Sequence, residues 1–359
     1  MEFSINAFVL IQALNKIKSA LQTPSFIKIK VSKNIVLASE HEGYSVVIKL
    51  DNAKIKSTGN ITLDFNIFSQ VVKSNSEITF KGDDTKLDFE YGKCKGSINS
   101  LEEISFQHKT SDSLFELDSK STLIFDYLDV LTLKDIKFGL DDAPISIDIE
   151  SKNKILELSS ATHSEAVLLS KKLKTSSNLS TALSPKILKR IKALVGKNNY
   201  KIALTESTLF IEFIDKVTLI TFTCPLPEAE VTSTENIKYL KRKQLDSTKN
   251  FITVESKDLA DYFSKLKAIV EPNNSIEMSV SKKGLNVIFT TSKGKVSDTL
   301  PSNSKSYKTD DTIFLIDYDL MQNNLSKLHG KIILYFCSKS LWIETEKDDT
   351  KIFIMVSLL

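Results

Sequence analysis

Histidine, which often serves as a general base or a metal ligand, is rare and scattered in this chain. No histidine has a second one three or four residues away, the spacing that places two imidazoles on one metal ion. The four residues are His41, His108, His163 and His329. We expect each to be an ordinary surface or core residue. An enzymatic role would require His163 and Glu165 to line a deep pocket with a third polar partner.

The three cysteines, Cys94, Cys224 and Cys337, stand far apart in the sequence and form no CxxC pair. Zinc sites and disulfide frameworks need cysteines at closer or recurring spacings. We therefore interpret the cysteines as free thiols in a reducing cytosol, and we expect neither a bound metal nor any other cofactor.

Phosphate-binding loops and paired catalytic acids are also not indicated. Four Gly-Lys pairs, which begin at Gly92, Gly196, Gly294 and Gly330, lack the Ser or Thr that follows the lysine in a P-loop. Adjacent acids lie beside turn-forming residues and are interpreted as solvated hairpin tips. These are the pairs Asp83-Asp84, Asp141-Asp142 and Asp348-Asp349. Without a convergent nucleophile, base or metal cluster, the protein is predicted not to be an enzyme.

The composition is typical of a globular protein, with 359 residues of which 41% are hydrophobic and 26% charged. This length predicts two or three domains, and the apolar fraction excludes a disordered chain. The chain has 48 Lys and Arg against 45 Asp and Glu, so any affinity for nucleic acid must depend on where the charges lie. No apolar run approaches the ~18 residues of a membrane helix, and Met1–Ser4 begins no signal peptide. We expect a soluble, cytoplasmic protein.

A local pattern recurs along the chain at intervals of about sixty residues. In each copy a short β-type run ends at Asn, Asp or Ser, whose side-chain oxygen can cap the helix that follows. The predicted caps are Asn6, Asn66, Asp118, Ser184, Ser256 and Asp317, and Pro185 stands at the first helical position after Ser184. Three further β-type runs follow the helix, for example Phe26–Val31, Ile35–Ser39 and Tyr44–Leu50 in the first copy.

The repeating unit is therefore predicted to be β-α-β-β-β, and about sixty residues are too few to bury a good core alone. Pairing six copies gives an α+β fold of three domains, each with two helices on one face of its sheets. The predicted domains are residues 1–113, 114–230 and 231–359, of which residues 231–249 form a linker. The alternative is an unrelated string of α+β domains whose period is accidental.

The fourth predicted helix, Pro185–Val195, separates an apolar stripe from a cationic face. The stripe consists of Ile187, Leu188, Ile191, Leu194 and Val195, and the remaining charged positions are Lys186, Lys189, Arg190 and Lys192. Other predicted helices carry Lys16, Lys18, Lys73, Lys265, Lys267 and Lys327. A solvated face explains any one of these lysines. Lysines on equivalent helices of a repeat would instead form a basic surface on a nearly neutral protein.

Three segments carry a resemblance, over the whole chain, to the bacterial-type β sliding clamp, the β subunit of DNA polymerase III. The first is Met1–Ile5, followed by an amphipathic helix. The second, Tyr262–Val270, is similar to the first helix of the family's third domain. The third comprises Asp317–Leu328, three strands, and then Ile354–Leu359 with its methionine and apolar tail. The chain resembles a divergent member, from a bacteriophage or a low-GC bacterium given its Lys, Asn and Ser usage.

The resemblance implies a DNA polymerase processivity factor that forms a head-to-tail homodimeric ring of six domains, with helices lining the hole and sheets outside. The ring would encircle double-stranded DNA without reading its sequence, because lysine contacts to phosphate carry no base information. A clamp-loader ATPase would open it, and the replicative DNA polymerase would bind it, in the cytoplasm at the nucleoid or in a phage's host. The DNA-facing residues would be Lys16, Lys18, Lys73, Lys186, Lys189, Arg190, Lys192, Lys265 and Lys327.

The family's partner groove takes short apolar peptides between the second and third domains. Its residues here would be Val167, Pro227, Val231, Leu320, Phe353, Met355 and Leu359. The joint between two copies would place Ile269 and Val270 against the strand that contains Lys95. The turn Thr162–Ala166 departs from the family's usual Thr-Asp-Gly-His-Arg, which leaves the preferred peptide open.

The second hypothesis is a structural assembly protein, such as a phage particle component built from the same β-rich repeats without DNA encirclement. Such a protein needs no lysines on equivalent helices, and neutral or acidic repeats throughout the chain would favour it. No membrane association is expected under either hypothesis.

Overall fold

The computed structural model describes most of the chain, and its residues form two compact units. The described residues are 1–72, 77–102, 104, 115–117, 123–133, 143–150, 152–172, 179–196, 198, 200–204, 208–215, 218–225, 234–246, 248, 250–267, 269, 275–281, 283–302, 304–306 and 313–359. Unit 1 comprises residues 1–125 and 186–228, and unit 2 comprises residues 126–185 and 229–359. The predicted second domain, 114–230, therefore contributes residues to both units.

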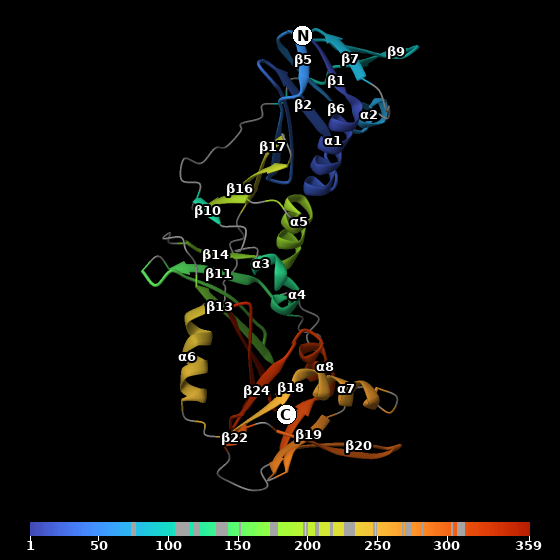
Figure 1. The fold of residues 1–359 in the computed structure, drawn as a ribbon. Coiled ribbons are helices and arrows are strands. Elements are labelled where there is room, and N and C mark those ends of the chain that lie inside the picture. Colours follow the sequence, from blue (N-terminus) through green and yellow to red (C-terminus); the bar gives the residue numbers. More distant parts are fainter. Residues whose placement is uncertain are drawn as a thin grey trace. The chain divides into compact units, whose positions relative to one another are not determined.

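Unit 1 contains two antiparallel sheets among its described residues (Figure 1). The first has the spatial order β5 (Ala53–Ser57), β1 (Glu2–Asn6), β7 (Glu77–Gly82), β8 (Lys86–Tyr91), β9 (Cys94–Asn99). The second has the order β10 (Phe115–Leu117), β15 (Tyr200–Leu204), β16 (Thr208–Asp215), β17 (Thr218–Pro225), β4 (Tyr44–Leu50), β3 (Ile35–His41), β2 (Phe26–Val31), β6 (Gly59–Asp64). The pairing of β17 with β4 joins segments far apart in the sequence into one sheet.

Unit 2 also contains two antiparallel sheets among its described residues. The larger has the order β14 (Leu179–Leu183), β11 (Ile145–Glu150), β12 (Ile155–Ala161), β13 (Glu165–Lys172), β26 (Thr350–Ser357), β25 (Ser340–Lys347), β24 (Lys331–Phe336), β18 (Phe251–Glu255), β22 (Ser304–Ser306). The smaller has the order β21 (Gly294–Leu300), β20 (Gly284–Thr291), β19 (Ser275–Ser281), β23 (Phe314–Asp317). Here the pairing of β13 with β26 joins the two segments of the unit.

The helices pack apolar side chains against these sheets. They are α1 (Ala7–Leu21), α2 (Phe65–Val71), α3 (Leu123–Asp126), α4 (Leu128–Leu131), α5 (Pro185–Val195), α6 (Thr234–Leu245), α7 (Ser256–Leu266) and α8 (Tyr318–Leu325). In α1 the buried Leu10, Leu14 and Ile17 recur at helical spacing, as predicted for an amphipathic helix. Among the described helices, none combines the length and the apolar character that crossing a membrane requires.

The predicted repeat is present in the order of the elements within the described residues. A strand, a helical segment and three strands recur six times, beginning at β1, β6, β10, β14, β18 and β23. In the first pair of copies, β1 joins the sheet of β7, β8 and β9, while β6 joins that of β2, β3 and β4. Each copy thus completes the sheet of the other, because one copy alone cannot enclose a core. The predicted α+β class is confirmed.

Helix caps agree with the sequence in part. The side chains of Asn6 and Asp317 accept hydrogen bonds from the N–H groups of Phe8 and Leu320, as capping predicts. The second helix is capped by Asp64 rather than Asn66, because it begins two residues earlier than predicted. Glu255 replaces Ser256 as the cap residue of α7. Asp118 lies outside the described residues.

Strands β5 and β22 and helix α6 have no counterpart in the predicted repeat. Strand β22, Ser304–Ser306, is an edge strand beside β18. Strand β5, Ala53–Ser57, adds an edge strand beside β1. Helix α6, Thr234–Leu245, forms within the segment that the sequence analysis assigned to a linker. It forms a helix because Ile237 and Leu245 share one face, which packs on the sheet, while charged residues occupy the other.

Candidate functional site

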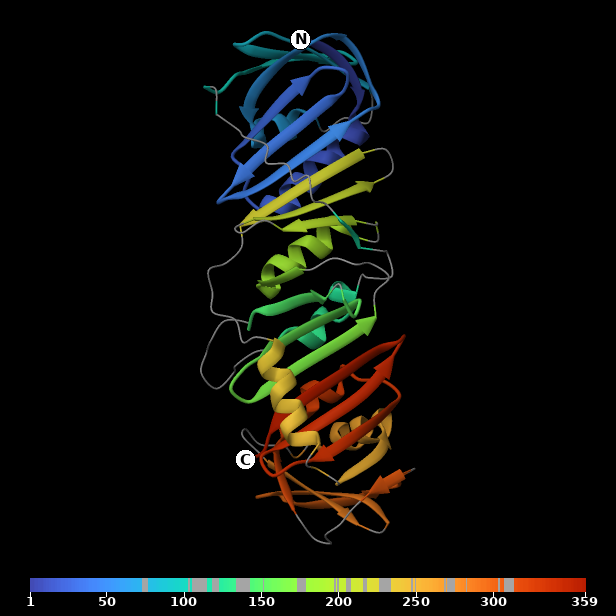
Figure 2. The ribbon, with the colours of Figure 1, turned by 90° about the vertical axis from the view of Figure 1, so that its left-hand side faces the viewer.

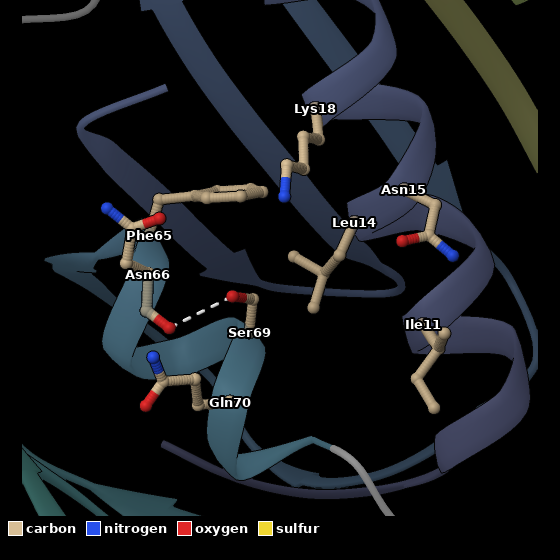
Figure 3. Close-up of a pocket in the computed structure, with 8 residues that line it drawn as sticks. All are labelled: Ile11, Leu14, Asn15, Lys18, Phe65, Asn66, Ser69 and Gln70. Atoms are coloured by element: carbon tan, nitrogen blue, oxygen red, sulfur yellow. Dashed lines mark hydrogen bonds between the residues drawn. The ribbon is translucent and has the colours of Figure 1, made fainter. Parts of the chain in front are cut away.

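The polar face of α1 lies beside a hollow between α1 and α2 (Figure 3). The hollow has a volume of about 300 Å³, with Leu14 and the ring of Phe65 at its base. Lys18 extends its ammonium group toward this space, and Asn15 lies on the same helix. On α2, the hydroxyl of Ser69 donates to the backbone carbonyl of Asn66 at 2.9 Å. The wall therefore presents amide groups and one cation, with no carboxylate among the lining side chains.

A second hollow, of about 340 Å³, lies between α1 and α5 on the other side of Asn15. Lys16 forms an ion pair there with Asp215, and its ammonium group lies 5.3 Å from the centre of the Phe213 ring. The side chains of Lys16 and Asp215 are 23% and 31% exposed. Lys16 is therefore already neutralised by a neighbour from β16.

The cations of α5 have different local environments. Arg190 donates to the side-chain oxygen of Gln22 at 2.8 Å and stacks over the Tyr44 ring at 5.1 Å. Lys192 donates to the backbone carbonyl of Phe125 at 2.8 Å. Lys189 is exposed, as is Lys186, which makes local contacts. The predicted apolar stripe of α5 is confirmed, because all five of its members are buried.

The remaining predicted DNA-facing residues are in unit 2 or outside the described residues. Lys265 is exposed on α7. Lys327, just after α8, is partly buried, and this burial lowers the pKa of its ammonium group although Glu165 and Asp129 oppose the effect. Lys73 lies outside the described residues.

These helix faces suit contact with a polyanion better than chemistry. Ammonium and amide groups donate hydrogen bonds to phosphate oxygens without reading bases. Within the described residues, no group of three or more His, Cys, Asp and Glu side chains could hold a metal ion. Glu165, one of the two residues considered for an enzymatic role, is buried and accepts a hydrogen bond from the Asn324 amide at 2.5 Å. This carboxylate therefore has a structural partner inside the unit.

The predicted groove residues Phe353 and Met355 lie on one face of β26. They pair directly with Leu168 and Ala166 of β13, so the four side chains form an apolar surface across the two strands. Val167 between them is 0% exposed and contributes to the opposite face. Pro227 and Val231 lie outside the described residues.

Helix α6 covers much of this apolar surface, lying along the sheet (Figure 2). Ile237 is 1% exposed and belongs to the same cluster as Phe353 and Trp342. The side-chain oxygen of Gln244 accepts hydrogen bonds from the Trp342 indole and from the Ser340 hydroxyl, the latter at 2.6 Å. The surface predicted to hold a partner peptide is therefore bounded by the chain's own helix.

Polar contacts hold the beginning of α6 against the neighbouring strand. The hydroxyl of Thr234 hydrogen-bonds to the Ser159 hydroxyl at 2.8 Å and to the carboxylate of Asp148. Lys238 donates to Glu157 and to Glu235, both at 2.8 Å. Burial opposes these bonds, yet they raise the pKa of Lys238 above its ordinary value.

The last two predicted groove residues lie elsewhere in unit 2. Leu320 is half-buried on α8. Leu359 is 61% exposed, but its backbone N–H donates to the carbonyl of Leu315 at 3.0 Å, and Leu315 is 40% exposed. The N–H of Leu358 donates to the carbonyl of Lys339. The backbone of Leu359 is thus hydrogen-bonded to β23, and the side chains of Leu315 and Leu359 are both exposed.

The residues predicted to join two copies lie at a sheet edge and after a helix. Lys95 is on β9, the edge strand of its sheet, and its ammonium group lies 3.0 Å from Glu90. Ile269 is half-buried just after α7, and Val270 lies outside the described residues. Strand β21 is also an edge strand, and its residues from Gly294 to Thr299 are exposed.

The three cysteines are Cys94, Cys224 and Cys337, of which the last two are buried. The predicted free state is confirmed for all three cysteines, and burial raises the pKa of Cys224 to about 12, which suppresses its reactivity.

The sequence analysis did not identify Ile237, Gln244 and Trp342, although the spacing of Ile237 and Leu245 is that of a helix face. The sequence analysis instead assigned residues 231–249 to a linker.

No family model matches the sequence, and no curated protein is detectably similar to it in sequence. Solved structures are nevertheless similar to the whole chain. The β subunit of the DNA polymerase of Streptococcus pyogenes has a TM-score of 0.78 and 16% identity, and the alignment covers 100% of both chains. The sliding clamp of Bacillus subtilis gives 0.77 and 16%, covering 100% of this chain and 99% of that one. The β clamp of Helicobacter pylori gives 0.78 and 12%, with 100% of both chains covered.

These comparisons show that the chain has the fold of bacterial DNA polymerase III β sliding clamps. The resemblance predicted from the sequence is confirmed at this level. The identity to the similar structures is 12–17%, so the likeness is one of fold.

Proposed function

We propose that this chain is a sliding clamp, in which two copies form a head-to-tail ring of six domains around duplex DNA. The observation that carries the proposal is the similarity to solved sliding clamps along the whole chain. The ring has no chemistry of its own. It tethers the replicative DNA polymerase and other replication proteins, and a clamp-loader ATPase opens it, in the cytoplasm at the nucleoid.

The DNA contacts of the proposed clamp are weak and confined to phosphates. Lys18 and Lys189 are the strongest candidates in unit 1, because both are exposed on helices and Lys18 lies beside an amide-lined hollow. Lys16 is neutralised by the Asp215 carboxylate, and hydrogen bonds to Gln22 and to the Phe125 carbonyl hold Arg190 and Lys192 in place, so we expect a smaller contribution from these three. The other members of the set are Lys73, Lys186, Lys265 and Lys327. Contacts of this kind allow sliding because they do not favour one sequence.

Two free sheet edges support the proposed joint between copies. The N–H and C=O groups of an edge strand can pair with a strand of another chain. In the ring, β9 of one protomer with Lys95 meets the third domain of its partner, where Ile269 and Val270 add apolar contact. The exposed residues of β21 at the edge of its sheet suit the same joint.

The proposed partner groove takes a short peptide of the polymerase or the loader on the surface around Phe353 and Met355. Leu320 and the exposed Leu359 add apolar surface for the remainder of the peptide. Val167 supports this part of the sheet from its opposite face, without contact to the peptide, and Pro227 and Val231 precede α6 in the sequence. Helix α6 already covers part of this surface, so the peptide binds beside α6 rather than on a bare sheet.

Sedimentation of the protein with and without a 30-bp duplex tests the proposed ring. We expect a species of twice the chain mass, free or with one duplex bound per two chains. The variant Ile269→Glu should remain a single chain under both conditions, because it places a charge at an apolar joint. A wild-type protein that stays a single chain with and without the duplex would contradict the ring.

A further inference from the structure

A cationic hollow lies beside α6, where the helix meets β13 and β26. Its volume is about 290 Å³. Leu168 and Phe353, which face each other across the two strands, form an apolar floor. Lys241 and Arg242 of α6 and Lys351 of β26 stand at its rim. A floor of this kind accepts an apolar side chain, whereas the rim favours a negative charge.

Lys241 reaches from the rim over the apolar floor. Its ammonium group lies 3.1 Å from the centre of the Phe353 ring, and no described residue forms a hydrogen bond or an ion pair with it. Burial lowers the pKa of Lys241 and the charge of Lys351 adds to this effect, although Glu344, Glu157 and Asp246 oppose it. A bound carboxylate would raise the pKa of Lys241, because an opposite charge stabilises the protonated lysine.

One carboxylate lines the hollow, and it is paired with a cation outside the proposed binding pair. Glu157 lines it, but its carboxylate accepts a hydrogen bond from Lys238 at 2.8 Å. Arg242 lies 3.9 Å from Glu235, with both side chains about two-thirds exposed, so this contact is weak. Glu344 also acts on Lys241, but it accepts a hydrogen bond from the Tyr335 hydroxyl at 2.7 Å and does not line the hollow. Within the described residues, Lys241 and Lys351 therefore stand beside the apolar floor without a carboxylate paired to either.

We propose that this hollow binds a short segment of a partner protein in which an acidic residue stands next to a large aliphatic or aromatic residue. The apolar side chain rests on Leu168 and Phe353, and the carboxylate pairs with Lys241 and Lys351. The inference builds on the proposed peptide groove and specifies the chemistry of its ligand. Helix α6 supplies one wall, so the specificity depends on an element outside the repeat.

A peptide fits this site better than a nucleic acid does. The hollow is local and accommodates one or two side chains, whereas a polynucleotide needs a groove that follows successive phosphates. The floor also offers aliphatic contact at Leu168. Glu157 in the wall would repel a phosphate, but it is compatible with a peptide whose carboxylate lies at the opposite rim.

Selection from a phage-displayed library of random octapeptides on the full chain tests the proposal. We expect enrichment of an acidic residue next to Leu, Ile, Met or Phe. The selected peptides, synthesised with a fluorescein label, should bind Lys351→Glu about tenfold or more weakly than wild type, because the variant removes one ionic contact and adds repulsion. Lys347→Glu makes the same change of charge at an exposed position of β25 that does not line the hollow, and its affinity should equal that of wild type.

Four results would overturn the proposal. The first three are the enrichment of no peptide, equal binding by wild type and Lys351→Glu, and a loss of affinity for a labelled 30-bp duplex rather than for the peptides. Enriched peptides without an acid that depend on Leu320 instead would also overturn it, yet would leave the peptide-binding function intact. Sedimentation with the duplex tests the ring independently of either outcome.

Discussion

Helices α5 and α6 carry similar charge but use it differently. Each has four cations, which in α5 are Lys186, Lys189, Arg190 and Lys192, and in α6 are Lys238, Lys241, Arg242 and Lys243. In α5, Arg190 and Lys192 contact an amide, a carbonyl and an aromatic ring, and Lys189 is exposed. In α6, Lys238 is held by two carboxylates and Lys241 lies over Phe353.

The difference shows that composition alone does not assign a basic helix to nucleic acid. A cation can contribute to phosphate binding only if its charge is not already compensated or enclosed. By this criterion α5 has cations that remain available to a polyanion. In α6, Lys238 instead binds the helix to the sheet, and Lys241 lines the hollow. The following experiments separate the two roles.

The largest effect is expected from a charge in the buried face of α6. Ile237→Asp places a carboxylate at a position that is 1% exposed, which should lower the free energy of unfolding by about 3–5 kcal/mol. Detachment of α6 should also expose Trp342, the only tryptophan of the chain, whose indole hydrogen-bonds to Gln244. A red shift of tryptophan emission measures this, and Tyr239→Asp, at a position of the same helix that is 60% exposed, is the control. Unchanged emission of Ile237→Asp would mean that α6 is not anchored there.

The next effect separates the two helices by their contribution to DNA binding. Replacing Lys18 and Lys189 with Ala should reduce the slope of log affinity against log salt by about 2, since each phosphate contact contributes about 0.9. Arg242→Ala with Lys243→Ala on α6 should leave the slope unchanged. Fluorescence anisotropy of a labelled duplex over a salt series measures both. An equal loss in the two double variants would refute the assignment of different roles.

Within α5, Arg190 should act mainly through its own unit. Arg190→Ala removes the hydrogen bond to Gln22 and the stacking on Tyr44, which should lower the free energy of unfolding by about 1 kcal/mol. The salt slope of DNA binding should stay at the wild-type value. Urea unfolding and anisotropy measure the two quantities, and a slope reduced by about 0.9 would instead assign Arg190 to DNA.

The smallest effect concerns the enclosed charge of Lys241. Lys241→Met should raise the free energy of unfolding at pH 7 by about 0.5–1 kcal/mol, because removal of a buried charge outweighs the lost contact with the Phe353 ring. Folding lowers the pKa of Lys241, so at pH values below the pKa in the folded state the buried charge destabilises the wild-type protein in full. This destabilisation disappears as the pH rises through the ordinary pKa of 10.5. The difference in free energy of unfolding between Lys241→Met and wild type should therefore shrink.

Urea unfolding at several pH values measures this advantage. Lys189→Met on α5 is the matched control, and it should change stability by less than about 0.5 kcal/mol at all of them, because Lys189 is exposed. A destabilised Lys241→Met at pH 7 would show that the contact with Phe353 dominates.

The order of the elements could be predicted from the sequence because local signals agree in each copy. Asn6 and Asp317 mark helix starts, and runs such as Tyr44–Leu50 alternate in burial as strands do. The pairing of β4 with β17 and of β13 with β26 could not be predicted in this way, because it depends on the register between distant segments. The two compact units follow these pairings.

Candidate site residues were predictable where a helix face exposed them. Lys18 and Lys189 belong to apparent cationic faces and are exposed in the structure. The sequence did not predict the partners of Lys16 and Arg190, because Asp215 and Tyr44 come from distant strands. It also did not predict α6, since a helix with so many charges is stabilised mainly by the surface of Trp342 and Phe353 beneath it.

The central claim, a ring that encloses DNA, is tested most directly by retention on nicked circular duplex before and after linearisation. The protein is loaded with its clamp-loader ATPase, and free protein is removed by gel filtration in enough salt to weaken phosphate contacts. The account predicts that protein stays on circles and is released once a restriction enzyme opens them. Equal retention on circular and linear DNA would contradict it.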